Sequence, residues 1–375
     1  MRIVFTGGGT GGHFYPIIAV AEAVRAICDE EKIIGTKLYY FSDSPYDKES
    51  LFENGIEFRY IPAGKLRIYQ SSKNYSDVIK TIIGSISSFF SLFVLYPDVV
   101  FCKGGYGSFP IVLAARILRI PVVVHESDTV PGRVNLWAGK FAKYIAVSYD
   151  ETVQFFKKER TILTGQPVRE IIKEKKSEGA FEYLKLDSSI PTIFVLGGSL
   201  GAEAINNIIL DSLPFLVDKY QIVHQTGINN YKDVTARAEF TLAGNTHKQR
   251  YLAFPFLNPL AMKMAAGASS LVISRAGSTI FEIASWGIPS ILIPIDYSHD
   301  DHQRKNAYNY ARHGAAEVIQ EKNLSPAILM AEIKRCLEDT PRREKMSLAA
   351  KAFSNKNASR TIARKLIDIG LSHEN

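Results

Sequence analysis

Short apolar runs alternate with longer segments of helical periodicity along the whole chain. Some short runs, such as residues 121–124, are apolar throughout, which is typical of parallel strands covered on both faces. The alternation predicts successive βαβ units. In the first half it predicts strands at 2–6, 37–42, 57–61, 98–102, 121–125 and 144–148, and helices near 16–29, 46–54, 76–95, 109–118 and 133–141.

The second half repeats this rhythm. Its predicted strands lie near 192–196, 221–225, 250–254, 271–274 and 290–294, and its helices near 202–217, 259–266, 278–286 and 301–313. We therefore predict an α/β protein of two doubly wound, Rossmann-like domains at 1–165 and 166–355, joined near 164–167. A last helix, at about 356–370, lies in the tail 356–375, and packing back on the first domain is one option for it.

The composition supports a division into two domains and indicates the cellular compartment in which the protein is expected. A chain of 375 residues is too long for one ordinary core, and 46% hydrophobic with 22% charged residues is globular. The cysteines, Cys28, Cys102 and Cys336, are scattered, which favours a reducing compartment. The start of the chain lacks the apolar core of a signal peptide, so a cytosolic protein is expected.

The net charge of +7, with a pI near 9.0, is spread over both halves. No basic tail predicts binding to nucleic acid. A mild positive charge suits an anionic ligand or an anionic membrane surface, although ordinary solubility explains it equally well.

The segment 78–96 departs from the alternating pattern because it is apolar over most of its length. Lys65, Arg67, Lys73 and Lys80 surround its start. Three interpretations remain open: a buried helix, which is favoured slightly, an amphipathic helix resting on a membrane, and a true membrane span. Its candidate membrane residues are Ile79, Ile83 and Phe90.

Two glycine-rich turns lie about half a chain apart, each between an apolar run and a helical segment. Residues 7–13 read Gly-Gly-Gly-Thr-Gly-Gly-His, and residues 197–202 read Gly-Gly-Ser-Leu-Gly-Ala. Such a turn gathers free N–H groups at the positive end of a helix dipole and so binds anions. We expect phosphate contacts at Gly198 and Gly201, and at the later helix start formed by Gly277 and Ser278.

Gly7, Gly9 and Gly12 also fit the dinucleotide-binding pattern G-x-G-x-x-G, with Asp43 after the second strand as the ribose carboxylate. An NAD(P)-dependent oxidoreductase is therefore an alternative. The second glycine turn and His13 count against it. Neither turn carries G-K-[ST], which argues against a P-loop NTPase.

Several polar residues occupy positions where chemistry is expected. His13 lies at a helix start, where the dipole disfavours imidazolium, and is a candidate base or hydrogen-bond donor. Glu126 and Asp128 follow a strand, as candidate bases or helix caps, beside the turn at 103–108. Glu282 is placed to accept ribose hydroxyls. The stretch 299–303 is a poor metal site, since adjacent loop residues rarely converge on one ion.

Taken together, these residues resemble the MurG family of bacterial N-acetylglucosaminyltransferases, glycosyltransferase family 28. The resemblance spans about residues 1–320 in the family's order. It is carried by residues 8–13 with Pro16, 104–106, 125–128, 165–169, 197–202, 275–277 with Glu282, and Gln303 with Asn306 and Ala307.

The resemblance implies a GT-B fold, with two Rossmann-like domains facing across a cleft. It implies transfer of N-acetylglucosamine from UDP-N-acetylglucosamine to the C4 hydroxyl of a lipid-linked N-acetylmuramyl-pentapeptide, with inversion. The C-terminal domain would bind the donor and the N-terminal domain the acceptor, without a metal or other cofactor. A GT-B transferase acting on another lipid remains an alternative.

The resemblance also assigns roles residue by residue. It implies UDP-sugar binding by Thr10, Gly11, Gly12, Arg169, Ser199, Glu282 and Gln303, with His302 as the alternative to Gln303. His13 matches a catalytic histidine, and Asp128 is the second choice as base. Gly104, Gly105 and Tyr106 are acceptor-side candidates. The expected location is the cytoplasmic face of the cell membrane, as a peripheral protein on an anionic surface.

Overall fold

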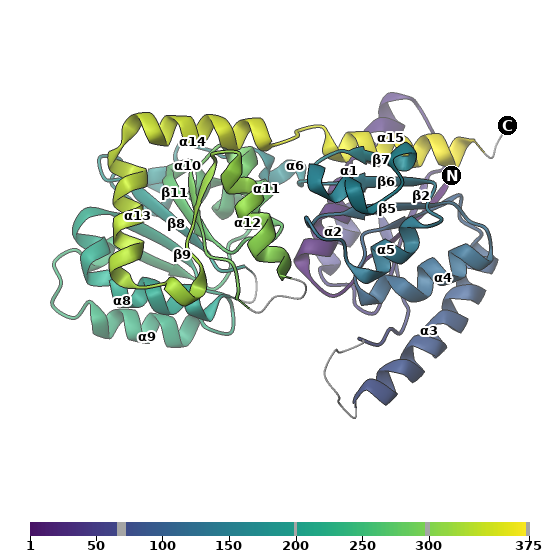
Figure 1. The fold of residues 1–375 in the computed structure, drawn as a ribbon, viewed down its shortest axis with the longest axis horizontal. Coiled ribbons are helices and arrows are strands. Elements are labelled where there is room, and N and C mark those ends of the chain that lie inside the picture. The colour runs from purple at the N-terminus through teal and green to yellow at the C-terminus, as the bar shows by residue number, and fades with distance from the viewer. Residues whose placement is uncertain (66–72, 199–200, 297–300, 373–375) are drawn as a thin grey trace. The chain divides into compact units, whose positions relative to one another are not determined.

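The computed structural model describes residues 1–65, 73–198, 201–296 and 301–372. Its contacts divide the chain into two units, and the ribbon of each can be followed in Figure 1. Unit 1 comprises Met1–Arg169 with Asn355–Asn375, and unit 2 comprises Glu170–Ser354.

Unit 1 is built on a seven-stranded, wholly parallel sheet in the order β3-β2-β1-β4-β5-β6-β7. The strands are β1 (Arg2–Thr6), β2 (Lys37–Ser42), β3 (Ile56–Tyr60), β4 (Val99–Cys102), β5 (Val122–Glu126), β6 (Tyr144–Val147) and β7 (Thr161–Leu163). The helices are α1 (Gly11–Glu30), α2 (Lys48–Glu53), α3 (Lys73–Leu95), α4 (Phe109–Ile117), α5 (Arg133–Gly139) and α15 (Ala358–Leu371).

Both faces of this sheet are buried, as its apolar strands predict. One face packs on α1 and α15, in a core that includes Phe5, Ile17 and Leu366. The other packs on α4, with Val100 and Ile111 in its core. Arg360 and Arg364 of α15 also form ion pairs with Glu30 and Glu31 at the end of α1.

Unit 2 is built on a six-stranded parallel sheet in the order β10-β9-β8-β11-β12-β13. The strands are β8 (Thr192–Leu196), β9 (Gln221–Gln225), β10 (Tyr251–Phe254), β11 (Ser269–Ser274), β12 (Ser290–Leu292) and β13 (Ala316–Val318). The helices are α6 (Glu170–Lys173), α7 (Ala180–Leu184), α8 (Glu203–Lys219), α9 (Tyr231–Thr241), α10 (Pro259–Ala268), α11 (Thr279–Trp286), α12 (His302–Arg312), α13 (Pro326–Glu338) and α14 (Thr340–Phe353).

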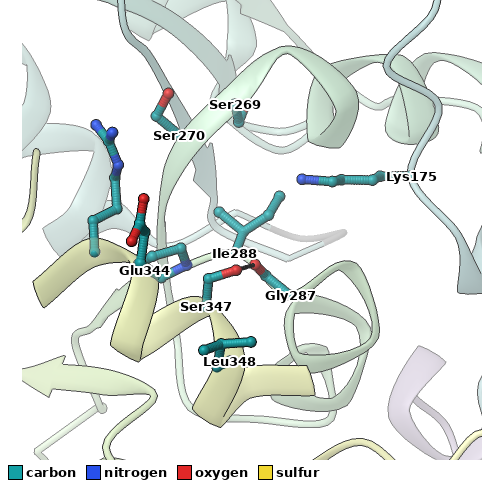
Figure 2. A pocket seen from close by; sticks show the side chains of 10 residues that line it. Lys175, Ser269, Ser270, Gly287, Ile288, Glu344, Ser347 and Leu348 are labelled. Carbon is teal, nitrogen blue, oxygen red and sulfur yellow. Dashed lines mark hydrogen bonds between the residues drawn. The ribbon is translucent and has the colours of Figure 1, made fainter. Parts of the chain in front are cut away.

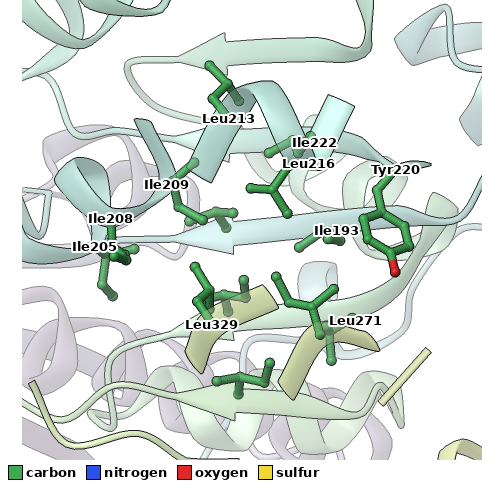
Figure 3. Packing of buried hydrophobic residues seen from close by; sticks show 14 of the residues in the cluster. Ile193, Ile205, Ile208, Ile209, Leu213, Leu216, Tyr220, Ile222, Leu271 and Leu329 are labelled. Carbon is green, nitrogen blue, oxygen red and sulfur yellow. The ribbon is translucent and has the colours of Figure 1, made fainter. Parts of the chain in front are cut away.

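On one face of this sheet, α8 and α13 bury an aliphatic core that Figure 3 shows, with Ile193 of β8, Ile209 of α8 and Leu329 of α13 in contact. On the other face, α10 and α11 pack through Met264 and Trp286. The two parallel α/β sheets confirm the predicted fold class. The sequence pattern missed the short edge strands β7 and β13, whose three residues each are too few to show alternation, and it missed α9, α13 and α14.

Candidate active site

In each sheet the strand order reverses direction once, and both glycine turns follow strands at that point. In unit 1 the reversal lies between β1 and β4, and in unit 2 between β8 and β11. Ligands of open α/β sheets bind outside the carboxyl ends of the strands at such a switch point. Each unit therefore carries one candidate site, built from two loops that the sequence separates by about 80 to 100 residues.

In unit 1 the two turns touch through their backbones. The Gly8 N–H donates to the Gly104 carbonyl at 3.0 Å. A Cβ on Gly105 would lie 3.0 Å from the Gly8 nitrogen, and the φ of Gly105 is 81°. Both facts require glycine there, because any side chain would separate the turns. The sequence-predicted residues Gly104 and Gly105 are thus brought against the first turn.

The start of α1 presents Thr10, Gly11, Gly12 and His13 at this edge. Thr10 is the extended residue before the helix, and its Oγ1 lies 2.8 Å from His13 Nδ1. This hydrogen bond orients the imidazole ring at the start of α1.

Tyr106 and Asp43 form a second contact between the turns. The Tyr106 hydroxyl donates to Asp43 Oδ2 at 2.8 Å. Burial, together with this bond to Asp43, raises the pKa of Tyr106 to about 12, so the phenol stays protonated. The Asp43 carboxylate that an NAD-type site would need for a ribose is engaged by Tyr106 instead.

Glu126 organises the loop that follows β5. Its Oε1 accepts from the N–H groups of Ser127 (2.8 Å) and Asp128 (3.0 Å), and its Oε2 accepts from Gly132 N–H (3.0 Å) and Asn135 Nδ2 (2.9 Å). Four donors occupy its four lone-pair positions. Glu126, an open candidate base in the sequence, is therefore a structural residue of this loop. Asn135 was missed because it lies nine positions downstream without a motif of its own.

Asp128 is half-buried at the same edge, and both its backbone N–H and its backbone carbonyl form hydrogen bonds. Its N–H donates to Glu126, and its carbonyl accepts from Thr152 Oγ1 at 2.9 Å. The neighbouring His125 is fully buried, with Nε2 at 3.2 Å from the Gly165 carbonyl. Burial and the charge of Lys103 hold the pKa of His125 well below its usual value, so it is neutral.

Arg169, the last residue of unit 1, stacks on an aromatic ring. Its Cζ lies 3.8 Å from the centroid of Tyr15, the second residue after His13. Tyr15 packs edge-on against Tyr46. A guanidinium over an aromatic face is held by a cation–π interaction. Sequence reasoning singled out Arg169 but gave no sign of its partner Tyr15.

In unit 2 the first turn joins β8 to α8. The Gly201 N–H donates to the Gly198 carbonyl at 3.1 Å, and both residues have positive φ, at 83° and 81°. A Cβ on Gly198 would meet nothing within 4 Å, so a ligand can approach its backbone. The predicted phosphate contact Ser199 lies outside the described residues.

The second turn of unit 2 joins β11 to α11. Arg275 pairs with Glu321 at 2.7 Å, a partner that the sequence did not reveal. Gly277 has open space where a Cβ would stand, Ser278 precedes the first turn of α11, and Glu282 is half-buried in that turn. The start of α11 is thus exposed at its amide end, as an anion site requires.

Helix α12 is attached to the same turn. Asn306 Nδ2 donates to the Ala276 carbonyl at 3.3 Å, and Gln303 Oε1 accepts from Ile295 N–H at 3.3 Å. His302 is the first residue of α12. His299 and Asp300 of the poorly rated metal stretch lie outside the described residues. Within the described part of the chain, no three metal-ligating side chains gather.

A cavity of ≈ 510 Å³ lies at the opposite, amino-terminal edge of the unit 2 sheet, where Ser269 begins β11 (Figure 2). Two of the serine hydroxyls in its wall bond the backbone, since Ser269 Oγ donates to the Ala265 carbonyl and Ser347 Oγ to the Gly287 carbonyl. Burial and the nearby Lys351 lower the pKa of Lys175 in its wall. The cavity contains none of the sequence-predicted site residues.

Helix α3 exposes an apolar stripe. Ile79, Ile83 and Phe90 are 58%, 53% and 61% exposed, and Ile86 and Phe93 continue the stripe. The other side of α3 packs on α4, and a Cβ on Gly84 would overlap the Pro62 carbonyl. The favoured prediction of a buried helix is therefore wrong for this stripe, because only the opposite side of α3, with Ser88, Leu92 and Leu95, is buried. The described residues contain one helix, Ser76–Leu95, long and apolar enough to cross a membrane.

Comparisons with known proteins agree with this geometry. The family model for the glycosyltransferase family 28 N-terminal domain matches residues 3–147, and that for the C-terminal domain matches residues 192–362.

Two curated proteins carry the name UDP-N-acetylglucosamine–N-acetylmuramyl-(pentapeptide) pyrophosphoryl-undecaprenol N-acetylglucosamine transferase. That of Treponema denticola is 38% identical and is covered over 86% of its length by 88% of this chain. That of Thermodesulfovibrio yellowstonii is 35% identical, and the match covers 96% of this chain and 97% of that protein.

Solved structures share the fold. The crystal structure of Acinetobacter baumannii MurG aligns with a TM-score of 0.72 at 24% identity, over 98% of this chain and 99% of that one. UDP-GlcNAc 2-epimerase from Neisseria meningitidis, bound to UDP-GlcNAc, aligns with a TM-score of 0.68 at 17% identity, over 98% and 100% of the two chains.

Proposed function

The chain belongs to glycosyltransferase family 28, and on that premise we propose how the two carboxyl edges divide the reaction. The protein is a UDP-N-acetylglucosamine-dependent N-acetylglucosaminyltransferase of peptidoglycan synthesis. It transfers N-acetylglucosamine to a lipid-linked N-acetylmuramyl-pentapeptide. The observation that carries this function is identity of 34–38% to transferases of that name over nearly the whole chain.

The donor binds to unit 2. Its diphosphate lies against the amides of the 198–201 turn and the start of α11 at Gly277 and Ser278. Open space at Gly198 and Gly277 supports this, because a phosphate can reach the backbone there. Glu282 accepts the ribose hydroxyls, Gln303 contacts the sugar, and Ser199 contacts the phosphates.

The acceptor binds to unit 1, at the edge that carries Gly104, Gly105 and Tyr106. The backbone contact between Gly8 and Gly104 supports this, since it makes one continuous surface from two turns. No metal or other cofactor takes part in the proposed reaction.

The reaction is a single inverting displacement. The C4 hydroxyl oxygen forms a bond to the anomeric carbon while the bond from that carbon to the diphosphate breaks, and its electron pair leaves with UDP. His13 takes the hydroxyl proton, with Asp128 as the second choice. The helix-start amides of unit 2 stabilise the charge that develops on the leaving diphosphate.

The lipid acceptor requires the enzyme to act at a membrane, and we assign the contact to α3. Its stripe of Ile79, Ile83 and Phe90 enters the interface of the cytoplasmic leaflet, with exposed Lys65 and Lys80 facing anionic headgroups. This arrangement is peripheral, because the other side of α3 packs on α4.

Incubation with labelled UDP-N-acetylglucosamine and a short-chain lipid acceptor tests the function. We expect the label in a lipid-linked disaccharide and release of UDP. Transfer to a different lipid only would favour the alternative family member, whereas hydride transfer with NAD(P) would overturn the family-based function. The second outcome is disfavoured by the engagement of Asp43 with Tyr106.

A further inference from the structure

Lys103 is a buried cation that the reaction described above does not use. It follows β4 directly, at the switch point, and its side chain is 1% exposed. Its Nζ has no hydrogen-bond partner among the described residues. Burial lowers the pKa of Lys103, whereas Glu126 and Asp128 act in the opposite direction, so a charged Lys103 depends on a nearby charge of opposite sign.

That charge is Glu126, at the end of the adjacent strand. Cys102 pairs with Val124 in the sheet, which puts Lys103 level with His125 and one position from Glu126. Burial raises the pKa of Glu126, as does Asp128, whereas the charge of Lys103 acts in the opposite direction. The other titratable groups near Lys103 are Asp128, the Cys102 thiol and His125. The buried thiol stays neutral because burial raises its pKa to about 11, and His125 stays neutral because burial and Lys103 lower its pKa.

The four donors on Glu126 require it to be ionised. A protonated carboxyl would direct an O–H at one of the N–H groups of Ser127, Asp128, Gly132 or Asn135 and lose that bond. Three of these four donors belong to the backbone of the 127–132 loop. Protonation of Glu126 would therefore loosen the loop that carries Asp128.

We propose that Lys103 is a positioning residue for the transfer reaction: its charge keeps Glu126 ionised and thereby fixes the 127–132 loop. Lys103 acts through Glu126 and touches no substrate. The part of Asp128 in catalysis rests on the proposed function, whereas the coupling of Lys103 to Glu126 does not. Two separate measurements distinguish these parts.

The first measurement is stability against pH, with Lys103→Met. Without the lysine, the folded-state pKa of Glu126 moves further above its unfolded value, so stability is lost as pH rises. We expect the melting-temperature deficit of Lys103→Met to widen from about pH 5.5 to about pH 8. In a Glu126→Gln background the widening should become smaller, because only the effect of the lowered pKa of Lys103 itself remains. Lys140→Met, at an exposed lysine at the end of α5, is the matched control and should show no such dependence.

The second measurement is the pH profile of kcat/KM for the lipid acceptor. We expect its acidic limb to move up by about one pH unit in Lys103→Met, so that on this limb the rate falls about tenfold. The KM for UDP-N-acetylglucosamine should stay within about twofold, since the donor contacts are elsewhere. Lys103→Arg, which keeps the charge, should restore the wild-type profile.

The proposal is overturned if the loss of melting temperature in Lys103→Met is the same at every pH. It is also overturned if the losses in Lys103→Met and Glu126→Gln simply add in the double variant. If Lys103→Met does not fold, recovery of folded protein in the double variant supports the coupling, and failure of the double variant together with a normal Glu126→Gln overturns it. If the wild type shows no transfer, the function fails while the stability measurement still decides the coupling.

Discussion

At the scale of single residues, hydrogen bonds decide which of the polar candidates are available for chemistry. Glu126 and Asp128 are two positions apart and look equivalent in the sequence. The structure gives Glu126 four donors and thereby removes it as a base. His13 lies at the start of α1, and its imidazole is oriented by Thr10 Oγ1, which lies 2.8 Å from Nδ1. The distinction follows from which backbone amides surround each group, and a sequence does not show that.

Replacing His13 by alanine should lower kcat by about 100-fold or more, since general base catalysis contributes that much. The KM for UDP-N-acetylglucosamine should change little. Thr10→Val is the companion variant: it keeps the imidazole but frees Nδ1, so we expect a smaller loss. Steady-state kinetics on the short-chain acceptor measure both, and an unchanged kcat in His13→Ala would transfer the base role to Asp128.

At the scale of elements, α3 and α15 show opposite uses of an amphipathic helix. The apolar side of α15 lies in the core of unit 1 through Ile362 and Leu366, both fully buried. The apolar stripe of α3 has no protein neighbour in the described part of unit 1. Both helices show the same amphipathic pattern in the sequence. Helical periodicity indicates an apolar side but does not indicate what packs on it.

Phe90→Asp and Ile83→Asp should each weaken binding to vesicles that contain anionic lipid by about tenfold or more, because an inserted apolar side chain contributes about 1.5–3 kcal/mol. Vesicle flotation measures the bound fraction. Phe240→Asp, at a phenylalanine of α9 that is 85% exposed, is the matched control and should bind normally. Equal loss in all three variants would remove α3 from the membrane contact.

Leu366→Ala should lower the free energy of unfolding of unit 1 by about 3 kcal/mol, the usual cost of truncating a buried leucine. Urea denaturation followed by fluorescence provides the measurement. Leu348→Ala, at an exposed leucine of α14, should change it by less than about 0.5 kcal/mol. A negligible effect of Leu366→Ala would mean that α15 is dispensable for the fold of unit 1.

At the scale of the whole molecule, one chain carries two sheets of the same design with different loops. Both place a glycine turn at the reversal of strand order. Unit 1 adds a second turn that contacts the first through Gly8 and Gly104, whereas unit 2 leaves open space at Gly198 and Gly277. The proposed division of donor and acceptor between the units rests on this difference.

UDP should stabilise unit 2 selectively. At about 100 times its Kd, a ligand that binds only the folded form raises the free energy of unfolding by about 2.7 kcal/mol. Differential scanning calorimetry should show this rise in the presence of UDP and none with NAD. Glu282→Gln should need more UDP for the same rise, and stabilisation by NAD instead would contradict the assignment of the donor site.

The sequence alone determined the fold class, the glycine turns and the family, because strand and helix periodicity and a glycine-dense turn are local properties that neighbouring residues fix. It did not determine that Lys103 and Glu126 lie side by side, that Tyr15 stacks on Arg169, or that the stripe on α3 is left uncovered. Each of these depends on which segments the strand order brings together. Distant elements pack by burying whole faces against one another. These three features were therefore decided only by the tertiary structure.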